Sequence, residues 1–445
     1  MSLNDTPRAN RLHIGIYGKR NAGKSSLINA LTGQETALVS AEAGTTTDPV
    51  FKSMELHPVG PVVFIDTAGF DDTGELGKLR VERTQAVMDR TDVAVIVIGA
   101  DSLSEDVIKG IGSSDNTGSE FAIEKSWIDD MDKKGVPIII ALNKVDCLGL
   151  SDKEPVQRES LSAAASAVGR ALGEYPVIPV SATSDIGLDR LRKAVAEAAP
   201  EDYLRERILG GMISEGGLAL LVMPQDIQAP KGRLILPQVQ TIRELLDRKC
   251  TAVATTADGL EKTLSLLNKA PELIVTDSQC FGEVYDKKPE QSELTSFSVL
   301  FAAYKGDIEK FTEGASALDD ILEKSRRKDS SIRILIAEAC THVPLEEDIG
   351  TIKIPRMLRG LLGESITVDN VRGSDFPDID RLAEYDLIVH CGACMFNRKL
   401  VMNRIAAAEA AGVPITNYGV ILAKLTGILD KIKLPQSREK QKDRA

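Results

Sequence analysis

Gly18-Lys19-Arg20-Asn21-Ala22-Gly23-Lys24-Ser25 is the stretch that decides the fold of this 445-residue chain. It follows an apolar run at residues 12–17, which predicts a buried strand, and it precedes residues 26–31, whose pattern predicts a helix. A strand, a glycine-rich turn ending in Gly-Lys-Ser and a helix together form a phosphate-binding loop. The glycines let backbone N–H groups turn onto a β-phosphate at the helix N-terminus, which favours anions.

Side chains of the same loop have expected roles. Lys24 would reach the β- and γ-phosphates, and the Ser25 hydroxyl would bind Mg²⁺. The residues of this loop that we expect to contact the nucleotide are Gly18, Asn21, Ala22, Gly23, Lys24, Ser25 and Ser26.

A second motif, Asp66-Thr67-Ala68-Gly69, follows the apolar residues 62–65. Asp66 would hold Mg²⁺ through a water molecule, and the backbone N–H of Gly69 would meet the γ-phosphate. We therefore place Asp66 and Gly69 with Lys24 in the expected catalytic set.

Two further motifs predict which base is bound, and we expect the nucleotide to be bound by Asn143, Lys144, Asp146, Ser181 and Ala182. Asn143-Lys144-Val145-Asp146 follows residues 138–142, and Ser181-Ala182-Thr183 follows residues 177–180. Asp146 can accept two hydrogen bonds from the N1–H and the exocyclic amine of guanine, which adenine does not offer. Lys144 would cover one face of the base, and the backbone at Ser181 and Ala182 would donate to its O6. Four motifs in this order, each after an apolar strand, predict that the nucleotide is GTP.

Composition limits the remaining possibilities. A chain of 445 residues is expected to form two to four domains. A net charge of −12 and an aromatic content of 4% argue against nucleic acid as a partner. The polar first residues and the shortness of the apolar runs predict neither secretion nor a membrane span, so we expect a cytoplasmic protein. Six cysteines in that compartment favour metal binding or redox chemistry over disulfides.

The alternation of strand and helix patterns divides the chain into segments. We expect a first domain at residues 8–200, a second at 201–285, a third at 286–434 and a disordered tail at 435–445. The second segment predicts a small sheet with a helix layer. It contains neither a phosphate loop nor a pair of acids, so we interpret it as an association module.

The third segment contains two groups of soft metal ligands. Cys340-Thr341-His342 follows the strand-like residues 332–336, and His390-Cys391-Gly392-Ala393-Cys394 follows residues 386–389. If both strands belong to one parallel sheet, the two groups meet at its carboxyl edge. The residues alone leave three possibilities open, namely a closed Cys₃His zinc site, an iron–sulfur cluster and a redox-active dithiol.

The GTP-binding motifs resemble those of the TrmE–Era–EngA group of GTPases. The run Gly44-Thr45-Thr46-Thr47-Asp48 is similar to the Gly-Thr-Thr-Arg-Asp run of that group, with Thr47 in place of the arginine. By this resemblance Thr46 is a Mg²⁺ ligand in the catalytic set, and Asn21 matches an asparagine that helps to hold K⁺ in several members. Phe70 stands where Ras-like enzymes carry the glutamine that orients water. We therefore expect slow, potassium-stimulated hydrolysis of GTP to GDP and phosphate.

The whole chain resembles the maturation GTPases of [FeFe]-hydrogenase, the HydF family. That family carries Cys-x-His, a spacer of about fifty residues and then His-Cys-x-x-Cys, and this chain has Cys340-x-His342, residues 343–389 and His390-Cys391-x-x-Cys394. The resemblance implies an α/β protein of three domains. They are an N-terminal P-loop GTPase domain with a Ras-like doubly wound sheet, a small α/β dimerisation domain and a C-terminal α/β iron–sulfur-cluster domain with a parallel sheet.

The same resemblance implies a scaffold or carrier. Cys340, Cys391 and Cys394 would bind the iron of a [4Fe–4S] cluster, and the candidate fourth ligands are His342, His390 and Glu338, which lies on the same strand face as Cys340. The carrier would receive a di-iron subcluster precursor from radical-SAM maturases (HydE- and HydG-like) and pass it to apo-[FeFe]-hydrogenase. GTP hydrolysis would gate the exchange of partners. A homodimer is implied, and its pairing into a tetramer is left open.

Two other functions are compatible with the motifs. One is a GTPase of tRNA modification or ribosome assembly with a structural zinc site, against which the acidic charge and the few aromatic residues count. The other is a redox-sensing GTPase in which Cys391 and Cys394 form a reversible disulfide.

Overall fold

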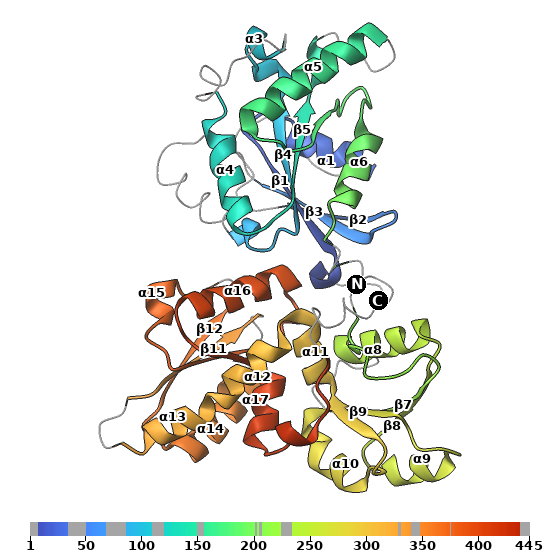
Figure 1. Ribbon diagram of the computed structural model, residues 1–445, viewed down its shortest axis with the longest axis vertical. Coiled ribbons are helices and arrows are strands. Elements are labelled where there is room, and N and C mark those ends of the chain that lie inside the picture. Colours follow the sequence, from blue (N-terminus) through green and yellow to red (C-terminus); the bar gives the residue numbers. More distant parts are fainter. Residues whose placement is uncertain are drawn as a thin grey trace. The chain divides into compact units, whose positions relative to one another are not determined.

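The computed structural model describes residues 8–33, 50–67, 86–108, 120–148, 155–200, 203, 207–223, 234–327, 331–339, 348–373 and 375–436. The chain divides into two compact units, Met1–Arg205 and Glu206–Ala445 (Figure 1). None of the described helices has the length and apolarity that crossing a membrane requires.

A six-stranded sheet organises the first unit, with the strand order β2-β3-β1-β4-β5-β6. Neighbouring strands are parallel except for β2 and β3, which are antiparallel. The strands are β1 (Leu12–Tyr17), β2 (Val50–Leu56), β3 (Gly60–Asp66), β4 (Val93–Gly99), β5 (Ile138–Asn143) and β6 (Val177–Pro179). Every residue of β1, β4 and β5 is buried, as expected for strands covered on both faces.

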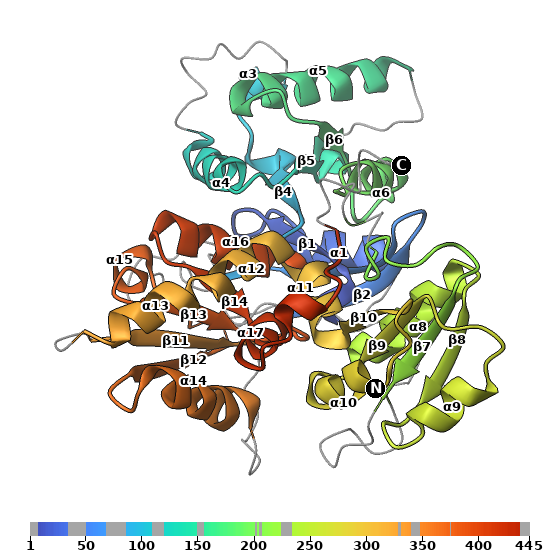
Figure 2. The ribbon, with the colours of Figure 1, turned by 60° about the horizontal axis from the view of Figure 1, so that its bottom comes forward.

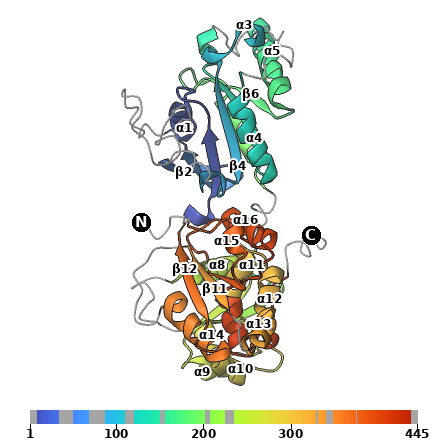
Figure 3. The same cartoon turned by 90° about the vertical axis from the view of Figure 1, so that its left-hand side faces the viewer.

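Helices cover both faces of this sheet. Leu27 of α1 and Leu191 of α6 pack on one face, and Trp127 of α4 and Leu161 of α5 pack on the other. Figure 3 shows α1 and α4 on opposite sides of β1 and β4. The helical elements are η1 (Arg8–Asn10), α1 (Lys24–Thr32), η2 (Ala100–Ser102), α3 (Glu105–Ile108), α4 (Ala122–Lys133), η3 (Val145–Leu148), α5 (Pro155–Leu172) and α6 (Leu188–Glu197). The predicted doubly wound fold is confirmed.

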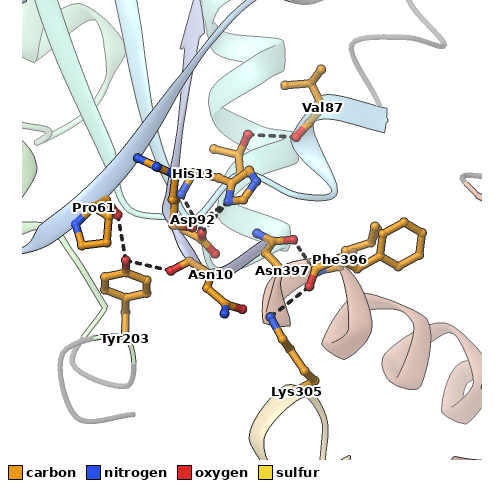
Figure 4. Close-up of polar contacts among 12 residues, drawn as sticks. Asn10, His13, Pro61, Val87, Asp92, Tyr203, Lys305, Phe396 and Asn397 are labelled. Atoms are coloured by element: carbon orange, nitrogen blue, oxygen red, sulfur yellow. Dashed lines mark hydrogen bonds and ion pairs between the residues drawn. The ribbon is translucent and has the colours of Figure 1, made fainter. Parts of the chain in front are cut away.

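Tyr203, near the C-terminal end of the first unit, is hydrogen bonded to the backbone where the sheet begins. The Tyr203 hydroxyl donates to the carbonyl oxygen of Pro61 at 2.9 Å, and it also lies 3.2 Å from that of Asn10 (Figure 4). The chain therefore returns to the start of β1 and β3 before it leaves this unit.

A four-stranded parallel sheet begins the second unit, with the order β10-β9-β7-β8. Its strands are β7 (Leu218–Val222), β8 (Thr251–Thr255), β9 (Leu273–Thr276) and β10 (Glu293–Ser296). Its helical elements are α8 (Leu236–Asp247), α9 (Leu260–Leu266), η4 (Ser278–Cys280), α10 (Phe281–Lys287) and α11 (Phe297–Lys305). Alternate strand residues point to opposite faces, so Leu221 packs with α8 and α11, whereas Leu220 packs with α9 and α10.

The fourth strand of this sheet lies beyond residue 285, where we expected the second domain to end. β10 pairs with β9 over the whole of its length, from Glu293 to Ser296. Its sequence Glu-Leu-Thr-Ser is short and polar, and it runs directly into the apolar helix α11, so periodicity alone hides the strand. The middle sheet therefore includes residues that the sequence pattern assigned to the third segment.

A second four-stranded parallel sheet follows, with the order β12-β11-β13-β14. Its strands are β11 (Arg333–Glu338), β12 (Thr367–Arg372), β13 (Leu387–His390) and β14 (Ile415–Asn417). Its helical elements are α12 (Ile308–Ser316), α13 (Leu318–Ser325), η5 (Ile349–Lys353), α14 (Ile354–Leu362), α15 (Ile379–Leu382), α16 (Arg398–Ala410), α17 (Tyr418–Leu425) and η6 (Leu429–Lys431). α14 and α16 lie on opposite sides of the sheet in Figures 1 and 2. The predicted parallel sheet is confirmed.

Candidate functional site

The phosphate loop joins β1 to α1 and takes its shape from two glycines. Gly23, the residue before α1, has a φ of 89°, a conformation that glycine adopts without strain. A Cβ at Gly23 would collide with the amide of Asn143, and one at Gly18 would collide with the backbone carbonyl oxygen of Val97. Asn21 lies between them with a φ of 63°, which asparagine tolerates better than most residues.

Lys24 is buried at the first position of α1. Its ammonium donates to the carbonyl oxygens of Gly18 and Lys19 at 2.8 and 2.9 Å. The positive charge is therefore folded back over the loop that would hold the phosphates.

The two expected Mg²⁺-binding groups lie together in the described structure. The Ser25 hydroxyl donates to Oδ2 of Asp66 at 2.5 Å. Burial raises the pKa of Asp66, and the hydrogen bond from Ser25 and the nearby charges of Lys24 and Lys52 oppose that rise. The Ser25 hydroxyl is an oxygen ligand of the kind that Mg²⁺ prefers, and the carboxylate hydrogen bonded to it lies where it could hold the ion through a water molecule. Thr46, Gly69, Thr47 and Phe70 lie outside the described residues.

Asn143 connects the base-recognition motifs to the phosphate loop. Its Nδ2 donates to the carbonyl oxygen of Ala22 at 3.0 Å, and its Oδ1 accepts from the backbone N–H of Ala182 at 3.3 Å. The side chain is buried. Asn143, which we expected to bind the nucleotide, therefore uses its amide to hold two loops of the site in register.

Asp146, which we expect to bind guanine, has one carboxylate oxygen held and one without a partner in the described structure. Its Oδ2 accepts from the Thr183 hydroxyl at 3.1 Å. Its Oδ1 is buried and has no hydrogen-bond partner among the residues that the structure describes. Hydrogen bonding from Ser181 and Thr183 holds the pKa of Asp146 below its usual range, so the carboxylate is ionised. A buried, unpartnered carboxylate oxygen suits the two N–H donors of guanine.

Lys144 has a partner that the sequence analysis missed. Its ammonium donates to Oδ2 of Asp101 at 2.8 Å. Asp101 stands in η2, directly after β4 at the carboxyl edge of the sheet. The signal that could have identified it is an acid placed just after a buried parallel strand, beside two strands that carry nucleotide motifs.

The second candidate site lies at the carboxyl ends of β11 and β13. These strands are parallel neighbours with Ala337 opposite His390, so the loops that follow them begin at one edge of the sheet, as predicted. Cys340 and His342 lie outside the described residues. In the described part of the chain, no three side chains of the His, Cys, Asp or Glu type gather in a way that could hold a metal ion.

Two backbone N–H groups point at the sulfur of Cys391. Its Sγ accepts backbone N–H groups of Ala339 at 3.0 Å and Ala393 at 3.4 Å. Ala393 has a φ of 53°, so the turn of Gly392 and Ala393 curls back toward the sulfur. Hydrogen bonds to the charged form of a group favour that form. Cys394 is exposed, whereas Cys391 is buried.

His390 is fully buried and both ring nitrogens have partners. Its Nε2 lies 3.1 Å from Nη1 of Arg404, which only donates, so Nε2 is the acceptor. Its Nδ1 then carries the proton and donates to the carbonyl oxygen of Cys391 at 2.8 Å. Burial and the neighbouring Arg404 charge lower the pKa of His390 to about 3, so the imidazole is neutral.

Two buried cations support the same loop. The Arg404 guanidinium lies 4.7 Å from the ring centres of Phe376 and Phe396, and Nη2 donates to the carbonyl oxygen of Gly373 at 2.5 Å. The ammonium of Lys305 donates to the carbonyl oxygen of Phe396 at 3.1 Å (Figure 4). The loop after Cys391 is thus held by α16 and by the end of α11.

Glu338 ends β11 and is buried with its carboxylate engaged. Nε of Arg372 donates to Oε2 at 3.1 Å, and the hydroxyl of Tyr418 donates to Oε1 at 3.2 Å. Burial and the adjacent Glu338 charge raise the pKa of Tyr418, so its hydroxyl stays protonated and remains a donor.

Comparisons with known proteins define the class of the first unit. A family model described as 50S ribosome-binding GTPase matches residues 13–144. The chain is 33% identical over 187 residues to GTPase Der of Wolinella succinogenes, covering 41% of this chain and 35% of that protein. It is 32% identical over 189 residues to the tRNA modification GTPase MnmE of Ralstonia nicotianae, covering 42% and 35%. The first unit is a P-loop GTPase domain.

The chain spans about a third of the length of these curated relatives. A solved structure of Era from Aquifex aeolicus aligns with 57% of this chain and 98% of its own, at 17% identity and a TM-score of 0.35.

The second unit defines the family. A model described as the hydrogen maturase F dimerization domain matches residues 208–306, and one described as the hydrogen maturase F tetramerization domain matches residues 309–434. With a GTPase domain in front of these two, the chain belongs to the hydrogen maturase F (HydF) family. It therefore carries domains that support a homo-oligomer.

Proposed function

We propose that this chain is a GTP-hydrolysing carrier in the maturation of [FeFe]-hydrogenase. It holds a [4Fe–4S] cluster, receives a di-iron precursor made by radical-SAM maturases and passes that precursor to the apo-hydrogenase. The observation that carries this proposal is the Cys391 sulfur, which accepts two backbone N–H groups at the shared edge of β11 and β13 in a chain of the HydF family.

The proposed cluster ligands are Cys340, Cys391 and Cys394. Thiolates suit iron–sulfur clusters, and the N–H groups of Ala339 and Ala393 point at the Cys391 sulfur, where they would stabilise its thiolate form. Cys394 is exposed, so this side of the loop is open to incoming iron and sulfide. A bound cluster would supply iron with an exchangeable coordination position.

The contacts of the three candidate fourth ligands differ. For His390 to bind iron, it would have to give up either Arg404 or the carbonyl oxygen of Cys391. For Glu338 to bind iron, its carboxylate would have to leave Arg372 or Tyr418. Each separation would take a hydrogen bond from a polar partner, and for the buried Arg404 that costs about 1–3 kcal/mol. We therefore propose that His390 and Glu338 support the site, and the remaining candidate, His342, lies outside the described residues.

GTP binding and hydrolysis follow from the first unit. Asp146 would recognise guanine, Lys24 would neutralise phosphate charge, and Ser25 and Asp66 would hold Mg²⁺ with Thr46. Phe70 has no group that could orient the attacking water, so hydrolysis is slow until a cation or a partner completes the site. The left-handed Asn21 is the proposed K⁺ ligand, and replacing potassium by sodium in a steady-state assay should lower the rate.

The nucleotide state is proposed to gate partner exchange in a homodimer. The middle domain would form the dimer, and the C-terminal domain, whose family model is described as a tetramerization domain, would pair dimers. The partners proposed are the two maturases and the apo-hydrogenase.

Anaerobic reconstitution of the full chain with iron and sulfide tests the carrier function. The expected result is iron and sulfide uptake with a broad thiolate-to-iron charge-transfer absorption, lost when Cys340, Cys391 or Cys394 is replaced by Ser. Tight zinc binding without iron uptake would instead favour a tRNA-modification or ribosome-assembly GTPase, such as the MnmE relative. A reversible Cys391–Cys394 disulfide without metal would favour a redox sensor.

A further inference from the structure

Lys144 combines an uncommon backbone conformation with a side chain that extends over the phosphate loop. Its backbone is left-handed, with a φ of 62°, which is uncommon for a residue with a long side chain. Its Cε lies 3.8 Å from the place that a Cβ on Gly23 would occupy, so the lysine chain runs back over the phosphate loop. The ammonium at its end donates to Asp101 at 2.8 Å.

Asp101 is the other end of this arrangement. Its Oδ1 lies 2.5 Å from the place that a Cβ on Gly99 would occupy, and that same place is 3.7 Å from the Cα of Ala22. A side chain at Gly99 would therefore displace the carboxylate. The lysine chain thus crosses the loop near Gly23 and ends at an acid next to Gly99, which itself lies against Ala22.

We propose that Asp101 is a positioning residue for guanine nucleotides. By pairing with Lys144, it holds the lysine chain extended across the phosphate loop, as a flat apolar surface on which the base stacks. A lysine chain without this anchor populates many rotamers, and it loses that freedom when the base binds. This inference deepens the proposed function and rests on the GTP binding proposed above.

A surface ion pair without such a role would behave differently. The side chains of Lys144 and Asp101 are 29% and 44% exposed, and exposed pairs contribute little to folding. Removing the carboxylate should therefore leave folding stability unchanged and should weaken nucleotide binding. If the pair had no role in binding, removing the carboxylate would leave nucleotide affinity unchanged, whether or not folding stability fell.

The experiment measures the affinity of the full chain for GDP in Asp101→Asn, Lys144→Met and the double variant. Each single change is expected to raise Kd about fivefold, which corresponds to about 1 kcal/mol. The double variant should be no weaker than the weaker single variant, because both changes remove one interaction. Asp130→Asn, which breaks the exposed pair of Asp130 with Lys133, is the matched control and should leave Kd unchanged.

Two further measurements separate positioning from recognition. Inosine diphosphate should lose the same factor as GDP in Asp101→Asn, because Lys144 covers the ring face and does not contact the exocyclic amine. In steady-state hydrolysis the KM for GTP should rise while kcat stays at the wild-type value. An unchanged Kd in Asp101→Asn, or losses that add in the double variant, would overturn the inference while GTP binding by the wild type still stands. A wild-type chain that bound no GDP would instead overturn the proposed function.

Discussion

At the scale of residues, the contacts of Asp146 fit its proposed role in recognising guanine. One carboxylate oxygen is held by Thr183, and the other is buried and unpartnered in the described structure. The held oxygen fixes the direction of the free one. A carboxylate that is oriented before the nucleotide arrives loses little freedom on binding, so its hydrogen bonds contribute more to affinity.

Replacing Asp146 by asparagine should change the preferred nucleotide from GTP to XTP. In Asp146→Asn the side chain presents an amide, which repels the amine of guanine but can donate to the corresponding carbonyl of xanthine. We expect GTP affinity to fall about 100-fold, the value of two charge-assisted hydrogen bonds of about 1.5 kcal/mol each, and XTP to bind better than GTP. Equilibrium titration with both nucleotides measures this, and an unchanged preference for GTP would refute the assignment.

The same residue predicts how binding depends on pH. Because the pKa of Asp146 is held below its usual range, the carboxylate remains ionised at every pH above the ordinary value for aspartate, about 3.9. The ratio of the GDP affinities of the wild type and Asp146→Asn should therefore stay constant as the pH is lowered from neutral toward that value, because protonation of the GDP phosphates affects both proteins alike. The ratio should fall only as the pH drops through the lowered pKa of Asp146. Titration of GDP binding by both proteins across this range is the measurement, and a fall in the ratio well above the ordinary pKa of aspartate would contradict the expectation.

His390, a candidate cluster ligand, is buried with both ring nitrogens hydrogen bonded, and we propose that it supports the loop without binding iron. Replacing His390 by Gln keeps an acceptor for Arg404 and a donor for the carbonyl oxygen of Cys391. We expect this variant to take up wild-type amounts of iron, whereas Cys391→Ser should not. The measurement is iron and sulfide content after reconstitution, with pulsed EPR of the reduced cluster to detect nitrogen ligands. Loss of a nitrogen coupling in His390→Gln would show that His390 binds iron.

At the scale of elements, the close packing of α12 on β14 can be tested by replacing two helical glycines with alanine, one inside this contact and one outside it. A Cβ at Gly314 of α12 would collide with the backbone of Ile415. Backbone atoms cannot move aside cheaply, so Gly314→Ala should destabilise the protein by about 1–3 kcal/mol. A Cβ at Gly360 of α14 would have no atom within 4 Å, so Gly360→Ala should be neutral or stabilising by about 0.5–1 kcal/mol. Chemical unfolding of the two variants gives the comparison.

The elements that sequence predicted best are those with a single strong signal. β1, with its apolar run before the phosphate loop, and the pair β11 and β13 were placed correctly because buried parallel strands read as continuous apolar runs. β10 was missed because it has only four residues, three of them polar, and continues directly into α11. Short edge strands carry too little pattern to be recognised before their neighbours are known.

The sequence predicted which residues form the candidate site, but it did not predict most of the contacts that those residues make. Motif spacing predicted that Ser25 and Asp66 lie close together, and the structure joins them by a hydrogen bond. Spacing could not assign Asp101 to Lys144, or Arg404 to His390, because those partners come from other elements of the fold. Pairing across a fold depends on packing, which no local pattern encodes.

At the scale of the whole molecule, the chain places its two proposed activities in different compact units. Lys24 belongs to Met1–Arg205, and Cys391 belongs to Glu206–Ala445. Each unit has its own sheets and its own buried cores, so each should keep its fold when the chemistry of the other is removed. Any effect of nucleotide on the cluster would then be a coupling free energy between two sites, and it would have to act in both directions.

Lys24→Ala tests this division. Removing the ammonium takes away the charge that would neutralise the phosphates, so GTP turnover should fall by at least about 100-fold. Iron and sulfide content after reconstitution should equal that of the wild type, because Lys24 and Cys391 belong to different compact units. Cys391→Ser is the reciprocal variant, with iron lost and GTP turnover kept. If either substitution removed both activities in a chain that still unfolds cooperatively, the two sites would be parts of one centre, and the carrier would need its nucleotide to hold its cluster.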